Sequence, residues 1–137
     1  MHSKLIPLTS PDVESRLHAA LGEHAVFHSP VRDYRGRADV THILMTIGDV
    51  LDEIEAGREL VDERQIVTFI NATFADHRMS GVLHETHDAL GRVESATLLL
   101  RPLSTLLEAI AGMREALERS PLPSALDAPR QVRHPSQ

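Results

Sequence analysis

The feature that most constrains the fold is residues 79–107, where the hydrophobic period changes from that of a strand to that of a helix. Residues 88–91, Asp-Ala-Leu-Gly, predict a chain reversal, because Asp can bond its own backbone and Gly accepts positive φ. Residues 93–101 are rich in β-branched and aliphatic side chains, as a return strand would be, and Pro102 would end that strand. An amphipathic helix ending at Ser120 is predicted next, with one apolar stripe made of Leu103, Leu106, Leu107, Ile110, Met113 and Leu117.

Two helices are predicted in the first half of the chain. Residues 9–12, Thr-Ser-Pro-Asp, form a helix start, and a short apolar stripe follows until Gly22. A longer helix is expected over about residues 39–56, because apolar side chains recur on one face until Gly57. Its last turn is acidic and opposes the helix dipole, so this end is expected to fray or to meet a basic partner.

The remaining segments predict strands. Residues 25–31 form a short strand that Pro30 places at a sheet edge, and residues 33–36 form a turn. Residues 60–61 begin another strand, and residues 66–75 give the strongest strand pattern of the chain. Helices segregated from three or four antiparallel strands predict an α+β fold. A curved antiparallel sheet wrapped around the long helix would form a cone, whose open mouth suits a small molecule.

Length and composition indicate the number of domains and argue against several classes of partner. The 137 residues suit a single domain over residues 1–120, followed by a flexible Pro-rich tail at 121–137. The absence of Cys excludes disulfides and thiolate chemistry and fits a reducing cytoplasm. A net charge of −6 with no basic run argues against nucleic acid, and no apolar run is long enough for a membrane span.

Several short segments together resemble a known family. They are the run Val-Phe-His-Ser-Pro-Val at residues 26–31, then Tyr34 and Gly36, a long helix, Gly81 and Gly91, and Leu-Arg-Pro-Leu at residues 100–103. In order and spacing they resemble the nuclear transport factor 2-like superfamily, and within it the SnoaL-like branch. The resemblance implies a cone-shaped α+β half-barrel that is often a homodimer through its outer sheet face. Its relatives include polyketide cyclases, limonene-epoxide hydrolases, steroid isomerases and domains without known catalysis.

The catalytic pattern of these relatives is altered here. Many SnoaL-like members have an Asp, two residues after the hairpin glycine, that acts as general base; Leu83 occupies that position. An aliphatic side chain cannot move a proton, and the Asp–Arg–Asp set of the epoxide hydrolases has no evident match. Glu85 is the nearest substitute, because the period of two puts it on the same strand face as Leu83. If that face is apolar and buried, Glu85 would have the raised pKa of a usable acid or base; the alternative is an outward, solvated Glu.

The histidines give one further candidate. His28, in the Phe-His-Ser-Pro run, could point into the cone and orient a ligand carbonyl or relay a proton; it could equally be a core His bonded to the backbone. His84 and His87 flank Glu85, but on a strand they point to opposite faces and cannot grip one ion, so no metal site is expected.

The other candidate side chains are polar groups near apolar ones. Asn71 could line the pocket or lie on a dimer face, and Tyr34 is interpreted as a packing residue whose hydroxyl is satisfied. The expected ligand-binding set is therefore His28, Tyr34, Asn71, Leu83 and Glu85, with His28 and Glu85 as the candidate catalytic pair and no cofactor. The sequence favours a homodimeric protein that binds a small hydrophobic molecule, with isomerase, cyclase or epoxide-hydrolase chemistry as an option. The alternative is a non-catalytic dimeric binding domain.

Overall fold

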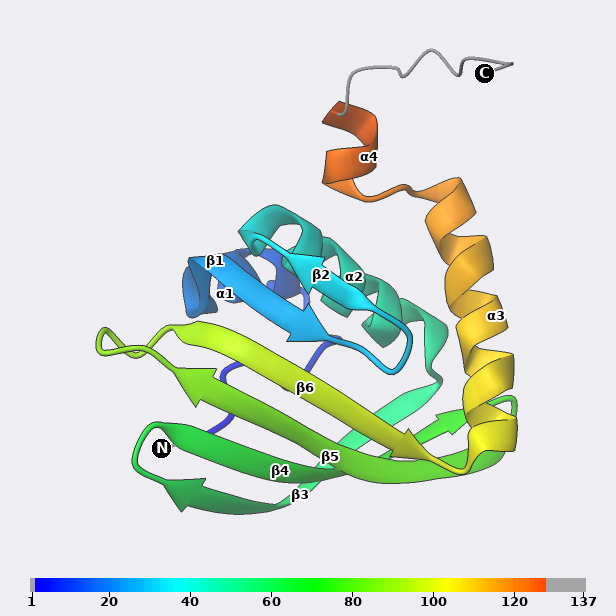
Figure 1. Ribbon diagram of the computed structural model, residues 1–137. Coiled ribbons are helices and arrows are strands. Elements are labelled where there is room, and N and C mark those ends of the chain that lie inside the picture. Colours follow the sequence, from blue (N-terminus) through cyan, green and yellow to red (C-terminus); the bar gives the residue numbers. More distant parts are fainter. Residues whose placement is uncertain (1, 128–137) are drawn as a thin grey trace.

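The computed structural model describes residues 2–127, in which a curved six-stranded sheet bends around helices (Figure 1). The elements in chain order are α1 (Val13–Ala20), β1 (Leu21–His28), β2 (Asp33–Arg35), α2 (Arg37–Val50), β3 (Glu53–Asp62), β4 (Gln65–Phe74), β5 (His77–His87), β6 (Val93–Arg101), α3 (Leu103–Arg119) and α4 (Pro123–Asp127). The predicted α+β fold and the hairpin followed by a helix are confirmed.

The sheet has the strand order β2-β1-β6-β5-β4-β3. Strands β3 to β6 form an antiparallel meander, whereas β1 pairs with β6 in parallel, so the sheet is mixed rather than purely antiparallel. Two features of the sequence shape the meander. Ala75 and Asp76 take positive φ in the tight turn before β5, and Gly91 does so in the loop before β6.

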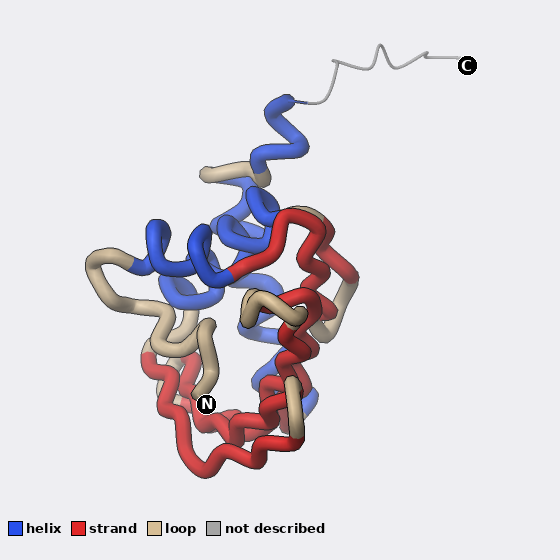
Figure 2. The backbone as a smooth tube through the Cα atoms, turned by 90° about the vertical axis from the view of Figure 1, so that its left-hand side faces the viewer, coloured by secondary structure: helices blue, strands red, loops and turns tan. Residues whose placement is uncertain are grey.

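The sheet is curved and not closed. In Figure 2 the strands bend around the lower and right-hand sides of the molecule and the helices lie above and behind them, which gives the predicted cone. Gly81 permits close approach within this bend, because a Cβ there would collide with the main chain of Leu99 on β6. We call the face that holds the helices the concave face and the opposite one the outer face.

The predicted long helix ends earlier than the sequence indicated. Helix α2 stops at Val50, and Ile54 belongs to β3, which pairs with β4 from Glu53 opposite Thr73 to Asp62 opposite Gln65. The Asp52 carboxylate accepts the Ala75 N–H at 2.8 Å and so joins this corner to the β4–β5 turn. The pairing of the ten-residue strand β3 with β4 outweighs the helical spacing of the apolar residues up to Ile54. The acidic residues at this end would also have opposed the dipole of a longer helix. Residues 60–61 accordingly lie near the end of a strand rather than at its start.

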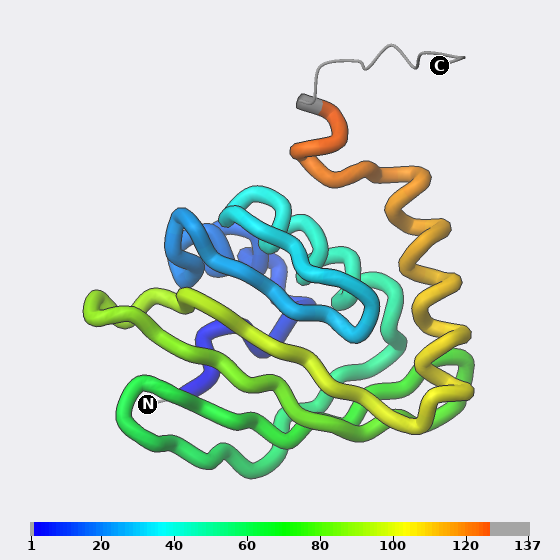
Figure 3. The backbone as a smooth tube through the Cα atoms, in the orientation of Figure 1, coloured from blue at the N-terminus to red at the C-terminus, as the bar shows by residue number. Residues whose placement is uncertain are grey.

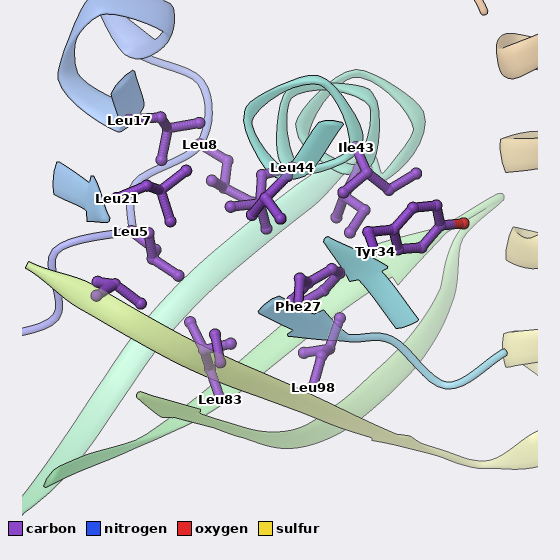
Figure 4. Close-up of a cluster of buried hydrophobic side chains, with 14 of the residues drawn as sticks. Leu5, Leu8, Leu17, Leu21, Phe27, Tyr34, Ile43, Leu44, Leu83 and Leu98 are labelled. Carbon is purple, nitrogen blue, oxygen red and sulfur yellow. The ribbon is translucent and has the colours of Figure 1, made fainter. Parts of the chain in front are cut away.

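The core lies between α2 and the concave face. Figure 4 shows Phe27, Leu83 and Leu98 pointing from the strands toward Ile43 and Leu44 of α2. The N-terminal segment, which we define as residues 2–8, also enters this core: Leu5 is fully buried and Leu8 nearly so. In Figure 3 its dark-blue trace runs along the inside of the sheet toward the helices.

The predicted tail is partly structured. Residues 123–127 form α4, where the Ser124 N–H and hydroxyl donate to the Asp39 carboxylate at the start of α2, and Leu122 is buried. The rest of the tail, residues 128–137, lies outside the described residues.

Candidate functional site

Strand β5 presents three alternating side chains to the concave face. Leu83, Glu85 and His87 are all buried, and Glu85 has no exposed surface. They share a face because side chains of a strand alternate with a period of two, as predicted for Leu83 and Glu85. His84, one residue away, lies on the outer face and contacts Gln65 at 2.8 Å, so the two histidines do point to opposite sides.

The Glu85 carboxylate is held by three donors. The Ser3 hydroxyl donates to Oε2, while the Lys4 N–H and the His87 Nε2–H donate to Oε1 at 3.0 and 3.1 Å. These bonds compensate for removing a carboxylate from water. The His87 imidazole is as deeply buried, and its Nδ1 has no hydrogen-bond partner within residues 2–127.

A second carboxylate, Glu59 of β3, reaches the same N-terminal residues. It accepts the Ser3 N–H and the His2 imidazole, each at 2.9 Å, and lies 3.5 Å from the Thr68 hydroxyl. The Ser3 N–H above all, and then His2, hold the pKa of Glu59 below its ordinary value. Ser3 therefore bridges two carboxylates of different strands, Glu59 and Glu85.

A separate apolar cavity lies beneath α3. It encloses about 60 Å³ and lies between α2, α3, the end of β6 and the loop that joins β1 to β2. Its walls are Ser29, Pro30, Val31, Tyr34, Ile43, Ile47, Leu51, Leu98, Leu100, Leu106, Ala109, Ile110 and Met113. Among the described residues that line it, Ser29 and Tyr34 are the two with a polar side chain.

A smaller cavity of about 30 Å³ lies next to the N-terminal segment, against Leu5, Ile6 and Leu8. The two cavities have Ile47, Leu51, Leu98 and Leu100 in common as lining residues. The interior of the cone is thus apolar, with α3 at one end and the N-terminal segment at the other. Glu85 is not among the residues that line either cavity, and it is bonded to Ser3 and Lys4 of that segment.

Tyr34 is one of the two polar residues that line the larger cavity. Its side chain is only 5% exposed, and Figure 4 shows its hydroxyl directed away from Phe27. Burial raises the pKa of the Tyr34 phenol, while the Arg32 guanidinium, 4.6 Å from the ring centroid, acts in the opposite direction. The phenol therefore stays protonated at neutral pH and is available as a hydrogen-bond donor.

Two predicted site residues lie away from both cavities. His28 follows the inward-facing Phe27 and so lies on the other face, where its Nδ1 is 2.7 Å from Asp33 and its side chain is 41% exposed. Asn71 is exposed on the outer face of β4, between buried Ile70 and Ala72. His28 is therefore neither on the cavity wall nor in the core, and Asn71 lies on the face for which a dimer contact was the second interpretation.

The sequence reasoning missed Ser3 and Glu59. The signal that could have found the N-terminal segment is its apolar residues Leu5, Ile6 and Leu8, which precede the first helix without a helical or strand period. Within residues 2–127 no group of three or more His, Asp or Glu side chains could hold a metal ion. No helix in this range is long and apolar enough to cross a membrane.

Solved structures with the same arrangement of elements are known. A steroid delta-isomerase from Pseudomonas aeruginosa matches with a TM-score of 0.74 and 28% identity, over 77% of this chain and 80% of its own. A SnoaL-like protein from Jannaschia sp. CCS1 matches with a TM-score of 0.64 and 11% identity, over 77% and 83% of the two chains. An NTF2-like protein of unknown function from Cytophaga hutchinsonii matches with a TM-score of 0.63 and 9% identity, over 75% and 88%. The sequence itself matches no protein-family model and no curated protein.

Proposed function

This chain has the nuclear transport factor 2-like fold, with a SnoaL-like protein among its structural neighbours, and we propose that it binds a small apolar molecule beneath α3. The observation that carries the proposal is the cavity there, whose wall is apolar apart from Ser29 and Tyr34. An apolar wall with one or two placed polar groups is typical of small-molecule sites.

The wall chemistry narrows the ligand class. The protonated Tyr34 phenol can donate a hydrogen bond, so the expected ligand is an apolar molecule with one acceptor oxygen, such as a ketone or an ether. A cavity of about 60 Å³ admits only a small ligand, since the pockets that hold drug-sized ligands measure roughly 300–1,000 Å³. A larger ligand would require α3 to shift; Thr105 and Ala109 are the fully buried residues of this helix, and Leu106, Met113 and Leu117 are partly buried against the core.

Between ligand binding alone and an enzymatic activity, the geometry favours ligand binding alone. Among residues 2–127, no carboxylate or imidazole lines the cavity, and the one buried acid in this range, Glu85, is already bonded to three donors. A general base must reach the proton that it removes. An isomerase, cyclase or epoxide-hydrolase activity remains the second candidate. The buried Glu85–His87 pair favours it, as does the likeness to a steroid delta-isomerase, and it would require residues 2–5 to leave Glu85.

A homodimer through the outer face is part of the proposal. Phe69, Val82 and Leu99 lie in register across three adjacent strands on this face, and Phe69 and Leu99 are 42% and 58% exposed. Leu60 and Val67 continue the apolar row on β3 and β4. An exposed apolar row of this kind is a preferred interface. Sedimentation of the wild type and of Phe69→Lys tests it: a dimer that dissociates in the variant is expected, and a wild-type monomer would contradict it.

Native mass spectrometry of the purified chain tests ligand binding. We expect the wild type to carry a small apolar compound, and Ala109→Leu, which fills the cavity from α3, to lose it. Ala111→Leu is the matched control, because Ala111 is exposed on the same helix and does not line the cavity. Retention of the same compound by Ala109→Leu would contradict the proposed site.

A further inference from the structure

We propose that Glu59, Glu85 and His87 form a binding site for a seryl peptide segment, and that the protein's own residues 2–5 are its resident occupant. The site is distinct from the cavity beneath α3. It recognises a serine-type β-hydroxy amide together with a leucine-type side chain two residues later.

The Glu59 and Glu85 carboxylates accept hydrogen bonds from successive donors of residues 3 and 4. The Ser3 N–H donates to Glu59, the Ser3 hydroxyl donates to Glu85, and the Lys4 N–H donates to the second oxygen of Glu85. Three consecutive donors of one seryl unit are therefore matched by two carboxylates. Hydrogen bonds to a charged acceptor are shorter and stronger than those between neutral groups, so this donor pattern is bound more tightly than neutral acceptors would bind it.

An apolar subsite for Leu5 lies beside the carboxylates. Leu5 is fully buried and lines the smaller cavity together with Phe27, Leu44 and Leu83. Leu83 directly precedes Glu85 in the inward alternation of β5. The polar and apolar contacts of residues 3–5 thus come from one continuous surface, on which the donor pattern and the leucine side chain are recognised together.

The N-terminal segment is attached to the rest of the protein by side chains rather than by main-chain pairing. No main-chain group of residues 2–8 is hydrogen-bonded to another main-chain group among the described residues. Within the segment, the Ser3 Oγ accepts the Leu5 and Ile6 N–H groups at 3.2 and 3.3 Å. The rest of the protein holds the segment through Glu59 and Glu85 and through the Arg16 guanidinium, which donates to the carbonyls of Lys4, Leu5 and Pro7. Glu59, Glu85 and Arg16 thus bind main-chain groups of the segment in the way that a protein binds a separate peptide.

Departure of residues 2–5 would remove hydrogen-bond donors from the buried Glu85 carboxylate. Among the described residues, Glu85 would then keep one of its three donors, the His87 Nε2–H, and a carboxylate at a buried position is costly when its hydrogen bonds are lost. The His87 Nδ1 is already buried without a partner among the described residues. A vacated site would therefore favour any molecule that supplies the same donors.

The test is peptide binding to the full chain with a loosened occupant. The variant Ser3→Ala/Leu5→Ala removes the hydroxyl and the leucine side chain, and Ser15→Ala/Leu90→Ala is the matched control at exposed positions. The probe is a fluorescein-labelled synthetic peptide with the sequence of residues 2–8, followed by fluorescence anisotropy. We expect saturable binding to the loosened variant and at least about tenfold weaker binding to the wild type and the control, whose own segment competes.

Two further measurements keep the outcome decisive. A peptide in which the serine is replaced by alanine should bind about tenfold more weakly or worse, since it lacks the hydroxyl that donates to Glu85. If the loosened variant does not fold, Ser3→Ala alone is used with the same peptides. Absence of binding to the folded variant, or equal binding of the serine and alanine peptides, would overturn the proposal.

Discussion

The His87 imidazole donates from Nε2 to the Glu85 carboxylate at 3.1 Å, and both side chains are buried on the concave face of β5. The two residues are separated by one residue on the strand, so their contact follows from the alternation of side chains. Glu85 also accepts from Ser3 and Lys4, which makes this carboxylate the point at which the N-terminal segment joins the sheet. The first predictions concern this junction.

Glu85→Gln should destabilise the protein by about 2–4 kcal/mol. The amide keeps the shape of the side chain but offers one acceptor oxygen where three donors converge, and its own N–H₂ would face other donors. Urea unfolding followed by circular dichroism measures the change. Glu94→Gln is the control, because Glu94 is exposed on the neighbouring strand β6 and should change stability by no more than about 0.5 kcal/mol. Equal effects of the two substitutions would show that Glu85 does not hold the segment.

Arg16→Lys should loosen the N-terminal segment without unfolding the sheet. The Arg16 guanidinium donates to three carbonyls of residues 4–7, and a lysine ammonium cannot reproduce this planar set of donors. Hydrogen exchange should accelerate at the Lys4 amide while the β4 and β5 amides remain protected. Arg35→Lys, at a side chain that is 71% exposed, is the control. Unchanged exchange at Lys4 would contradict the anchoring role of Arg16.

The attachment of Ser3 should weaken in acid. The pKa of Glu59 is lowered in the folded protein, above all by the Ser3 N–H. The stability that this bond contributes is therefore present above the ordinary pKa of 4.5 and is lost as the pH falls through the lower folded-state value. Thermal unfolding of the wild type and of Glu59→Gln between pH 7 and pH 3 measures this. The difference between them should shrink as the pH falls; a difference that stays constant would rule out this linkage.

Gly48→Ala should destabilise the protein although alanine favours helix formation by about 1 kcal/mol. A Cβ at Gly48 of α2 would collide with the Leu8 carbonyl and lie 3.0 Å from the Leu8 Cβ, so the helix or the N-terminal segment must move. We expect a net loss of about 1–3 kcal/mol. At Gly112 of α3 the added Cβ would meet only side-chain atoms, of Phe74 and Val50 at 3.2 Å, which can give way. Gly112→Ala should thus be close to neutral, and a stabilising Gly48→Ala would refute the close contact.

The elements with local signals could be predicted from the sequence. The β5–β6 hairpin and α3 follow from the Asp-Ala-Leu-Gly reversal and from a clear change of period, and alternation placed Leu83 and Glu85 on one face. The same alternation could have placed His28 correctly, because Phe27 beside it has the stronger reason to face the core.

Long-range contacts explain what the sequence did not reveal. The parallel pairing of β1 with β6 and the bonds from Ser3 to Glu59 and Glu85 join residues far apart in the chain, and no local period encodes them. The helical spacing of Ile54 continued that of α2, but pairing of β3 with β4 decided its conformation. The apolar cavity likewise depends on how α3 packs against α2 and β6, which its own stripe does not specify.

The most direct measurement for the central claim is a methyl NMR titration of the full chain with cyclohexanone, an apolar ring with one acceptor oxygen. The account predicts saturable shifts at methyl groups that line the cavity beneath α3, among them Ile43, Leu106 and Ile110, with little change at Leu60 on the outer face. Tyr34→Phe should weaken the binding because it removes the donor to the ketone. Saturable shifts confined to the outer face, or none at the cavity methyl groups, would contradict the account.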